Sequence, residues 1–168
     1  MAFNFSGATF LSFAVTSELD DRDQRLFEAN EGLTSAVVDD LLKQASQRIL
    51  TQIRNTDWWK SYAFDQDTTL NRDLRLLPNV NPSYIKSREQ EFKDLNIYFT
   101  LSEYVYPRIA DFGNPESAEV VKIKFFRDQY DNLFKELIES GDWYDFDGDA
   151  TIELTEKDPN KQNRVRVR

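Results

Sequence analysis

One long amphipathic segment near the C-terminus constrains the fold of this chain more than any other feature. Between Ser117 and Ser140, large apolar side chains recur at the spacing of one helix face: Phe126, Tyr130, Leu133, Phe134 and Leu137. Gly141 follows directly, where a residue with left-handed backbone commonly ends a helix. Because such an apolar stripe must be covered, we expect the chain to be built by helix packing.

Three further segments complete the expected bundle. A short helix over 18–29 follows Thr16 or Ser17, a second begins at Thr34 or Ser35 and continues toward Tyr62, and a third runs from Pro82 to Pro107. The sequence therefore predicts a mainly α fold, with a helical bundle of about four helices over residues 16–141. The side chains expected to be mutually buried are Val38, Leu41, Leu42, Ala45, Ile49, Leu95, Phe99, Phe126, Tyr130, Leu133 and Leu137.

Two stretches carry apolar side chains without a helical period. Residues 1–15 contain four phenylalanines around Gly7, so we expect an extended N-terminal arm or weak strand, docked on its own core or on a neighbour. Residues 64–82 are rich in Asp, Asn and Pro, and Leu74, Leu76 and Leu77 alternate weakly among them, as in a strand or hairpin. Since long unpatterned loops are usually functional, we predict that 64–82 is a projecting arm that binds a neighbouring subunit.

The segment 142–168 joins an acidic loop to a basic tail. Counted from Asp145, acids occupy oxygen-ligand positions of an EF-hand calcium loop: Asp145, Asp147, Asp149, Glu153 and Glu156. Ala150 stands where that loop has glycine, and no helical pattern follows. The alternative interpretation is a solvated acidic turn, with Gly148 at positive φ, leading into a strand. We therefore expect no cofactor, with calcium at this loop as the one alternative.

Two more features are candidates for partner binding. Trp58 and Trp59 point about 100° apart on a helix, which favours one core and one interface tryptophan over a stacking platform for a small molecule. Residues 151–154 and 164–168 alternate with period two and predict a short C-terminal β element. Arg164, Arg166 and Arg168 then share one face, either as a frayed basic tail or as a strand that adds to another chain's sheet.

The composition excludes several classes of function. The chain has no cysteine and no histidine, which removes disulfides, thiolate chemistry, the Ser-His-Asp triad and nearly all zinc chemistry. Carboxylate pairs are expected by chance among 30 acids, and no phosphate-binding loop accompanies them, so we expect no enzyme. The net charge of −9 disfavours general nucleic-acid binding, because phosphate contacts need a basic face. No apolar run predicts a membrane span or signal peptide, which indicates a cytosolic origin.

The order of elements resembles the head-tail adaptor (connector) proteins of tailed bacteriophages. The segments that carry the resemblance are the Ala/Ile-patterned helix 36–54, the aromatic helix 95–106, the closing helix 125–141 and the acidic ending 142–149. The resemblance implies a structural virion protein of the neck, assembled in the host cytoplasm. It implies a dodecameric ring that joins the portal protein to the tail or to other neck proteins, and that lines the DNA channel without binding DNA specifically.

The residues predicted to bind partners are Trp58, Trp59, Leu74, Leu76, Arg164, Arg166 and Arg168. Two alternatives stay open. One is a calcium-binding regulatory module built on residues 145–156. The other is a different phage structural part, such as a tail-completion, head-completion or capsid-decoration protein.

Overall fold

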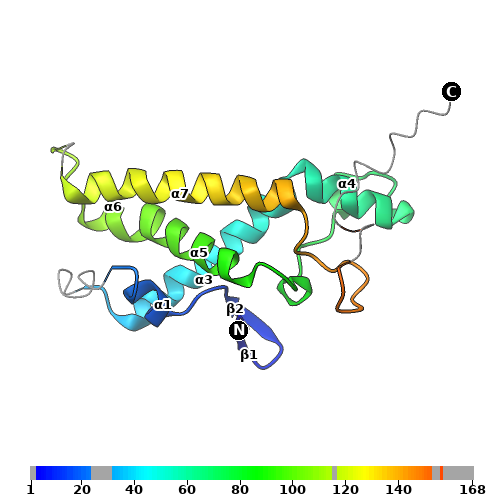
Figure 1. Ribbon diagram of the computed structural model, residues 1–168, viewed down its shortest axis with the longest axis horizontal. Coiled ribbons are helices and arrows are strands. Elements are labelled where there is room, and N and C mark those ends of the chain that lie inside the picture. Colours follow the sequence, from blue (N-terminus) through cyan, green and yellow to red (C-terminus); the bar gives the residue numbers. More distant parts are fainter. Residues whose placement is uncertain (1–2, 24–31, 115–116, 153–155, 157–168) are drawn as a thin grey trace. The chain divides into compact units, whose positions relative to one another are not determined.

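The computed structural model describes residues 3–23, 32–114, 117–152 and 156, and it is mainly helical with a small N-terminal hairpin (Figure 1). The predicted fold class is confirmed. The chain forms two compact units, residues 1–48 with 89–135 and residues 49–88 with 136–168. The helices α3 (Ser35–Asn55) and α7 (Ala118–Ser140) contribute residues to both units.

The N-terminal stretch of the first unit folds back on itself. Strand β1 (Asn4–Ser6) pairs antiparallel with β2 (Thr9–Ser12), and Gly7 has φ +62° in the turn between them. Phe3 and Phe13 are buried, and both rings contact Phe92 in edge-on or tilted geometry, at centroid distances of 6.2 and 5.3 Å. The described part of the predicted arm therefore docks on the chain's own core, which is one of the two places expected for it.

The short helix that follows is shorter than predicted. Helix α1 (Thr16–Asp20) begins where Glu18 accepts a hydrogen bond from the backbone N–H of Val15 at 3.0 Å. Lys93 also pairs with the Glu18 carboxylate and is itself buried, so this acid joins the helix start to α5 (Glu89–Phe99). The predicted helix over 18–29 ends at Asp20, and its remainder from residue 24 lies outside the described residues.

The stripes predicted from the sequence make most of the core. All the side chains expected to be buried are so except Leu133, which is only partly buried, because the α7 stripe faces solvent there. Ile49 and Leu137 belong to the second unit. The main cluster of the first unit contains residues from α3, from α5, from the turns at 100–106 that follow α5, and from α7: Val38, Leu41, Leu42, Ile97, Leu101, Val105, Tyr106, Ile123 and Phe126.

A buried polar chain runs through this apolar core. Ser46 accepts from the backbone N–H of Phe13 at 3.0 Å and from the side-chain amide of Asn96, which also donates to the carbonyl of Leu42 at 3.2 Å. Thr100 donates to the carbonyl of Asn96 at 2.8 Å. Since unpaired buried polar groups are costly, this chain fixes the hairpin's exit against α3 and α5.

The third predicted helix starts later and is less regular than expected. Residues Pro82–Tyr84 form a 3₁₀ turn, η3, and α5 begins only at Glu89. A π-helix, η4 (Thr100–Val105), follows α5 and continues into α6 (Tyr106–Ile109), which contains Pro107. A proline clashes with the carbonyl four residues earlier in an α-helix, and the wider π turn relieves that crowding.

The second predicted helix is two helices. α3 ends at Asn55, and α4 (Asp57–Gln66) begins after Thr56, whose hydroxyl accepts from the N–H of Trp59 at 3.2 Å and donates to the carbonyl of Ile53 at 2.7 Å. The single helix expected through Tyr62 is therefore wrong, because a capping threonine interrupts it.

Beyond α7, the described residues contain no C-terminal strand: Thr151 and Ile152 are irregular, and the rest of the predicted β element lies outside them. None of the helices in the described ranges is both long and apolar enough to cross a bilayer.

Candidate calcium loop and interaction surfaces

The end of α7 is fixed before the acidic loop begins. Gly141 has φ +59°, and its N–H donates to the carbonyl of Leu137 at 3.2 Å, as the sequence predicted for a helix end. The indole N–H of Trp143 and the hydroxyl of Ser140 donate to the same carbonyl at 2.7 and 2.9 Å. The last turn of the helix therefore sets the direction of the chain that follows.

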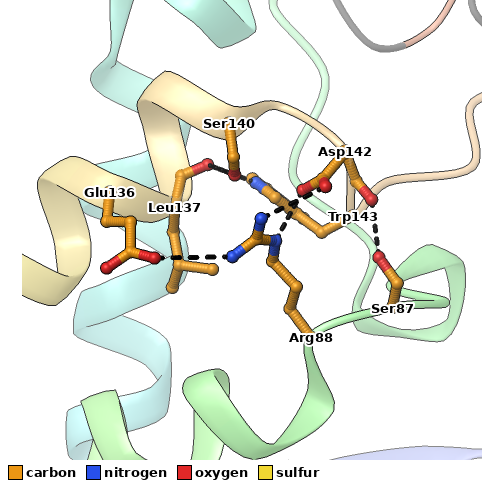
Figure 2. A network of polar contacts seen from close by, with 7 residues as sticks. All are labelled: Ser87, Arg88, Glu136, Leu137, Ser140, Asp142 and Trp143. Carbon is orange, nitrogen blue, oxygen red and sulfur yellow. Dashed lines mark hydrogen bonds and ion pairs between the residues drawn. The ribbon is translucent and has the colours of Figure 1, made fainter.

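Arg88 holds this helix end from the side (Figure 2). Its Nε lies 2.6 Å from Oδ1 of Asp142, its Nη2 lies 3.2 Å from Oδ2, and its Nη1 lies 3.7 Å from Glu136. Ser87 donates to the carbonyl of Asp142 at 2.5 Å. The Arg88 guanidinium keeps the pKa of the Asp142 carboxyl below its usual value. Arg88 has φ +56°, a backbone conformation that is costly for a side chain of this size, so the clamp offsets local strain.

Six aromatic rings of the second unit pack beside the loop. Trp58 lies 4.8 Å from Trp143 and Trp59 lies 5.0 Å from Tyr144, measured between ring centroids. Phe146 contacts Trp58, Trp59, Tyr62 and Tyr144. Trp59 is buried and Trp58 half-buried, so the predicted core tryptophan is confirmed, whereas Trp58 lies against aromatic rings of its own unit. Burial raises the pKa of Tyr144 to about 12.

The loop itself is a series of tight carboxylate turns. Asp145 is fully buried, and its two oxygens accept from the N–H groups of Gly148 at 2.7 Å and Ala150 at 2.9 Å. Asp149 accepts from the hydroxyl of Thr151 at 2.5 Å and from its N–H at 2.8 Å, and these bonds lower the pKa of the Asp149 carboxyl. Each aspartate thus bonds the backbone two to five residues later, and the turns draw the acids together.

Ala150 adopts the backbone that the calcium-loop pattern requires at its sixth position. Its φ is +72°, although the sequence has no glycine there, and Gly148 has φ +79°. A residue with a side chain accepts this conformation at a cost of about 1–2 kcal/mol. The backbone of Ala150 therefore adopts the conformation of the calcium loop, although the sequence has alanine where that loop has glycine.

The three predicted aspartate ligands converge. One carboxylate oxygen from each of Asp145, Asp147 and Asp149 lies within 4.8 Å of the others. Calcium binds six to eight oxygens at about 2.3–2.6 Å, so two ligands on opposite sides of the ion lie about 4.8 Å apart, and the spacing fits. Glu156 is buried, but it accepts from the N–H of Phe146 at 2.8 Å and is not among the three converging acids. Glu153 lies outside the described residues.

The loop is joined to the segment before α5. The N–H of Asp145 donates to the carbonyl of Tyr84 at 2.8 Å, and the N–H of Lys86 donates to the carbonyl of Trp143 at 3.0 Å. Ile85 and Tyr144 form an isolated antiparallel β-bridge. The hydroxyl of Tyr144 accepts from the N–H of Asn81 at 3.2 Å. Residues 81–86 therefore form the wall of the loop, which the sequence had not indicated.

The segment 64–82 is not a projecting arm along its whole length. Residues up to Gln66 belong to α4, and Leu77 and Val80 are buried. Two short 3₁₀ turns lie between the end of α4 and Leu77: η1 (Thr68–Leu70) and η2 (Leu74–Leu76). Arg54 donates to the carbonyl of Leu77 at 2.8 Å and the indole of Trp59 to that of Pro78 at 3.0 Å. These bonds hold the second half of the segment to its own unit.

Of the predicted partner-binding residues, two are clearly exposed. Leu74 and Leu76 are 59% and 56% exposed, as a contact surface requires. Arg164, Arg166 and Arg168 lie outside the described residues.

A second exposed apolar surface, missed in the sequence, lies on α7. We name it the α7 groove, an open hollow of about 460 Å³ lined by Val120, Val121, Lys124, Phe125 and Asp128. Val121 and Phe125 are 57% and 54% exposed. Their i, i+4 spacing, separate from the buried stripe, was the signal that could have revealed it.

Comparison with known proteins gives no identification: no family model, no curated protein and no solved structure matches this chain.

Proposed function

We propose that this chain is a structural virion protein, a head-tail adaptor in the neck of a tailed bacteriophage. In this role its copies form a ring, with twelve subunits as the family resemblance implies, which joins the portal protein to the tail. Three of the four segments that carry the resemblance lie on helices: one on α3, one on α5 with η4, and one on α7. A net charge of −9 suits a channel through which DNA slides, because like charges keep the duplex from adhering.

The observation that carries the proposal is the exposure of apolar pairs on a strongly acidic chain. Leu74 with Leu76 and Val121 with Phe125 are each more than half exposed. Exposed apolar side chains that gather in patches mark interaction surfaces, and such surfaces are what an assembly subunit needs. The exposed pairs support a role as a subunit of an assembly, and the assignment to a phage neck follows from the resemblance.

Electron microscopy of the purified protein, alone and mixed with its cognate portal protein, tests the proposal. We expect rings of twelve subunits seated coaxially on the portal. A ring of another symmetry would assign the chain to another structural part, such as a tail-completion or head-completion protein. A protein that stays monomeric at all concentrations and does not bind portal would refute a role in the neck.

The convergent aspartates favour a second candidate function, a calcium-binding regulatory module. Asp145, Asp147 and Asp149 would hold the ion, and calcium would supply positive charge that joins their carboxylates. Carboxylate oxygens are the ligands that calcium prefers, and site charge and rigidity set the affinity.

Calorimetry with calcium, with a chelator control, tests this candidate. Asp147→Asn should weaken binding at least about tenfold, since it removes a convergent carboxylate charge. Asp128→Asn, on α7 and outside the loop, is the matched control and should change nothing. Tight binding by a protein that remains monomeric favours the regulatory module over the adaptor. Lack of heat and of thermal stabilisation at millimolar calcium would eliminate it.

A further inference from the structure

We propose that the α7 groove receives the leucine turn, Asp73–Leu76, of a second copy of this chain. The contact is head-to-tail, since it joins two different surfaces. A contact of this kind, repeated from copy to copy, closes a ring when the rotation allows it. The inference rests on the proposed adaptor function and supplies the subunit contact that this function needs.

The groove has the chemistry of a protein contact more than of a small-molecule site. Val120, Val121 and Phe125 give it an apolar lining, and its polar groups are two opposite charges one helical turn apart, Lys124 and Asp128. Neither charge forms an ion pair with another of the described residues, so both are available to a partner. Small-ligand pockets instead enclose several convergent polar groups.

The leucine turn is held ready for binding. The carboxylate of Asp73 accepts from the backbone N–H of Arg75 at 2.9 Å and from its guanidinium at 2.7–3.1 Å. Arg75 lowers the pKa of Asp73, and both groups stay charged at neutral pH. The base of the turn is anchored by Leu77, which is buried and bonded to Arg54. A turn already fixed in shape loses little conformational entropy on binding.

The two surfaces are complementary in both apolar character and charge. Leu74 and Leu76 would cover Val121 and Phe125, while Arg75 would meet Asp128 and Asp73 would meet Lys124. A chain with net charge −9 repels its own copies, so association requires opposite charges placed at the contact.

Other apolar candidates on the chain are single residues. The described residues include three further exposed large hydrophobics, Val15, Tyr84 and Phe112, which lie apart from one another in the sequence. Within the described ranges, the leucine turn alone offers a second pair of nearby exposed apolar residues. A two-fold contact of one α7 groove with another would leave that pair uncovered.

Engineered disulfides test the contact directly, because the chain has no cysteine of its own. One full-length copy carries Leu76→Cys and a differently tagged copy carries Phe125→Cys. Under mild oxidation the mixed disulfide should exceed either homodisulfide by about tenfold or more, since only close and correctly oriented thiols are bridged. The matched control replaces Phe125→Cys by Asp131→Cys, an exposed α7 position off the groove, and should give background yield.

Charge reversal in the same pair of copies tests the register. Arg75→Asp in the first copy, or Asp128→Arg in the second, should lower the mixed-disulfide yield severalfold, and combining them should restore part of it, because Arg75→Asp also removes the side-chain bonds of Arg75 to Asp73. All four positions are on the surface, and circular dichroism verifies that each variant is folded. A dominant Phe125→Cys homodisulfide, a mixed yield equal to the control, or no recovery in the combined reversal would each overturn the inference.

The two proposals fail in different ways. Portal-bound rings from a protein whose mixed disulfide stays at background would leave the adaptor function in place and remove this contact. A strong, charge-dependent mixed disulfide without portal binding would keep the contact and remove the adaptor function.

Discussion

Two stretches of this chain, residues 3–13 and residues 73–88, carry apolar side chains without a helical period. They differ in whether the first large apolar side chains are buried or exposed. In the first stretch Phe3 and Phe13 are buried against Phe92. In the second, Leu74 and Leu76 stay exposed, although the chain that follows them is tightly held.

The difference lies in where the anchors are. In the first stretch, the backbone bond from Phe13 to Ser46 coincides with the aromatic contacts, so side chains and backbone are fixed at one place. In the second, the anchors begin at Leu77 and continue to Arg88, after the exposed pair. An unpatterned apolar stretch is therefore not by itself a partner surface; it becomes one where its anchors leave the apolar groups uncovered.

The largest expected effect concerns the buried stretch. Phe13→Ala should lower the free energy of unfolding by about 3–5 kcal/mol, because a fully buried ring is lost and a cavity remains. Denaturant unfolding measures it, with the half-buried Phe10→Ala as the milder comparison. A loss below about 1 kcal/mol for Phe13→Ala would mean that the hairpin is not part of the core.

The backbone anchor of the same stretch gives the next effect. Ser46→Ala leaves the N–H of Phe13 without its side-chain acceptor and removes one of the two bonds of the Asn96 amide, so it should cost about 1–3 kcal/mol. The exposed Gln44→Ala on the same helix is the control and should be near neutral. In a double-mutant cycle, the costs of Ser46→Ala and Phe13→Ala should be non-additive. Additive costs would mean that the hydrogen bond to Ser46 and the packing of the Phe13 ring stabilise the fold independently.

The anchor of the second stretch should be weaker and dependent on pH. The pair Arg88–Asp142 is partly exposed, and Asp142→Asn should cost about 1 kcal/mol near neutral pH. Folding lowers the pKa of Asp142. The carboxylate therefore contributes its full stabilisation above its pKa in the unfolded chain, about 3.9, and loses it as the pH falls through its lower pKa in the folded protein. Thermal melts from neutral to acid pH should converge for variant and parent below about pH 4. Parallel curves would contradict this role.

The smallest effect on stability belongs to the exposed pair. Leu74→Ser and Leu76→Ser should each change the free energy of unfolding by no more than about 0.5 kcal/mol, because these side chains make little contact within their own chain. Sedimentation of the same variants should show weaker self-association. A loss of stability like that of Phe13→Ala would show that the leucines are structural.

The elements that sequence reasoning predicted well are those with a strong local signal. The α7 stripe and its end at Gly141 follow from spacing and from one glycine, and the convergence of Asp145, Asp147 and Asp149 follows from alternation in a turn. The break at Thr56 also had a local signal, a capping residue followed by Asp57, but the apolar period of α3 continues across it and concealed it.

Other features depend on partners far apart in the sequence. Arg88 and Asp142 are 54 residues apart, and neither has a neighbour that indicates the pair. The burial of Leu77 next to the exposed Leu76 likewise depends on Arg54. Leu133 fits the apolar period of α7, but its side chain is only partly buried. Periodicity states which face is apolar, but only the packing decides how far along the helix that face is covered.

The π-helix η4 has a consequence for how this region can change. One residue added to an α-helix rotates everything after it by about 100°, and a π turn accommodates such an addition without breaking the helix. With η4 in place, Tyr106 is buried, stacks on Phe126 at 5.8 Å between centroids, and donates to Asp23. Deletion of one residue within 100–105 would restore an even helix and turn Tyr106 off Phe126. The length of this stretch is therefore fixed by the burial of Tyr106 and by its contact with Phe126.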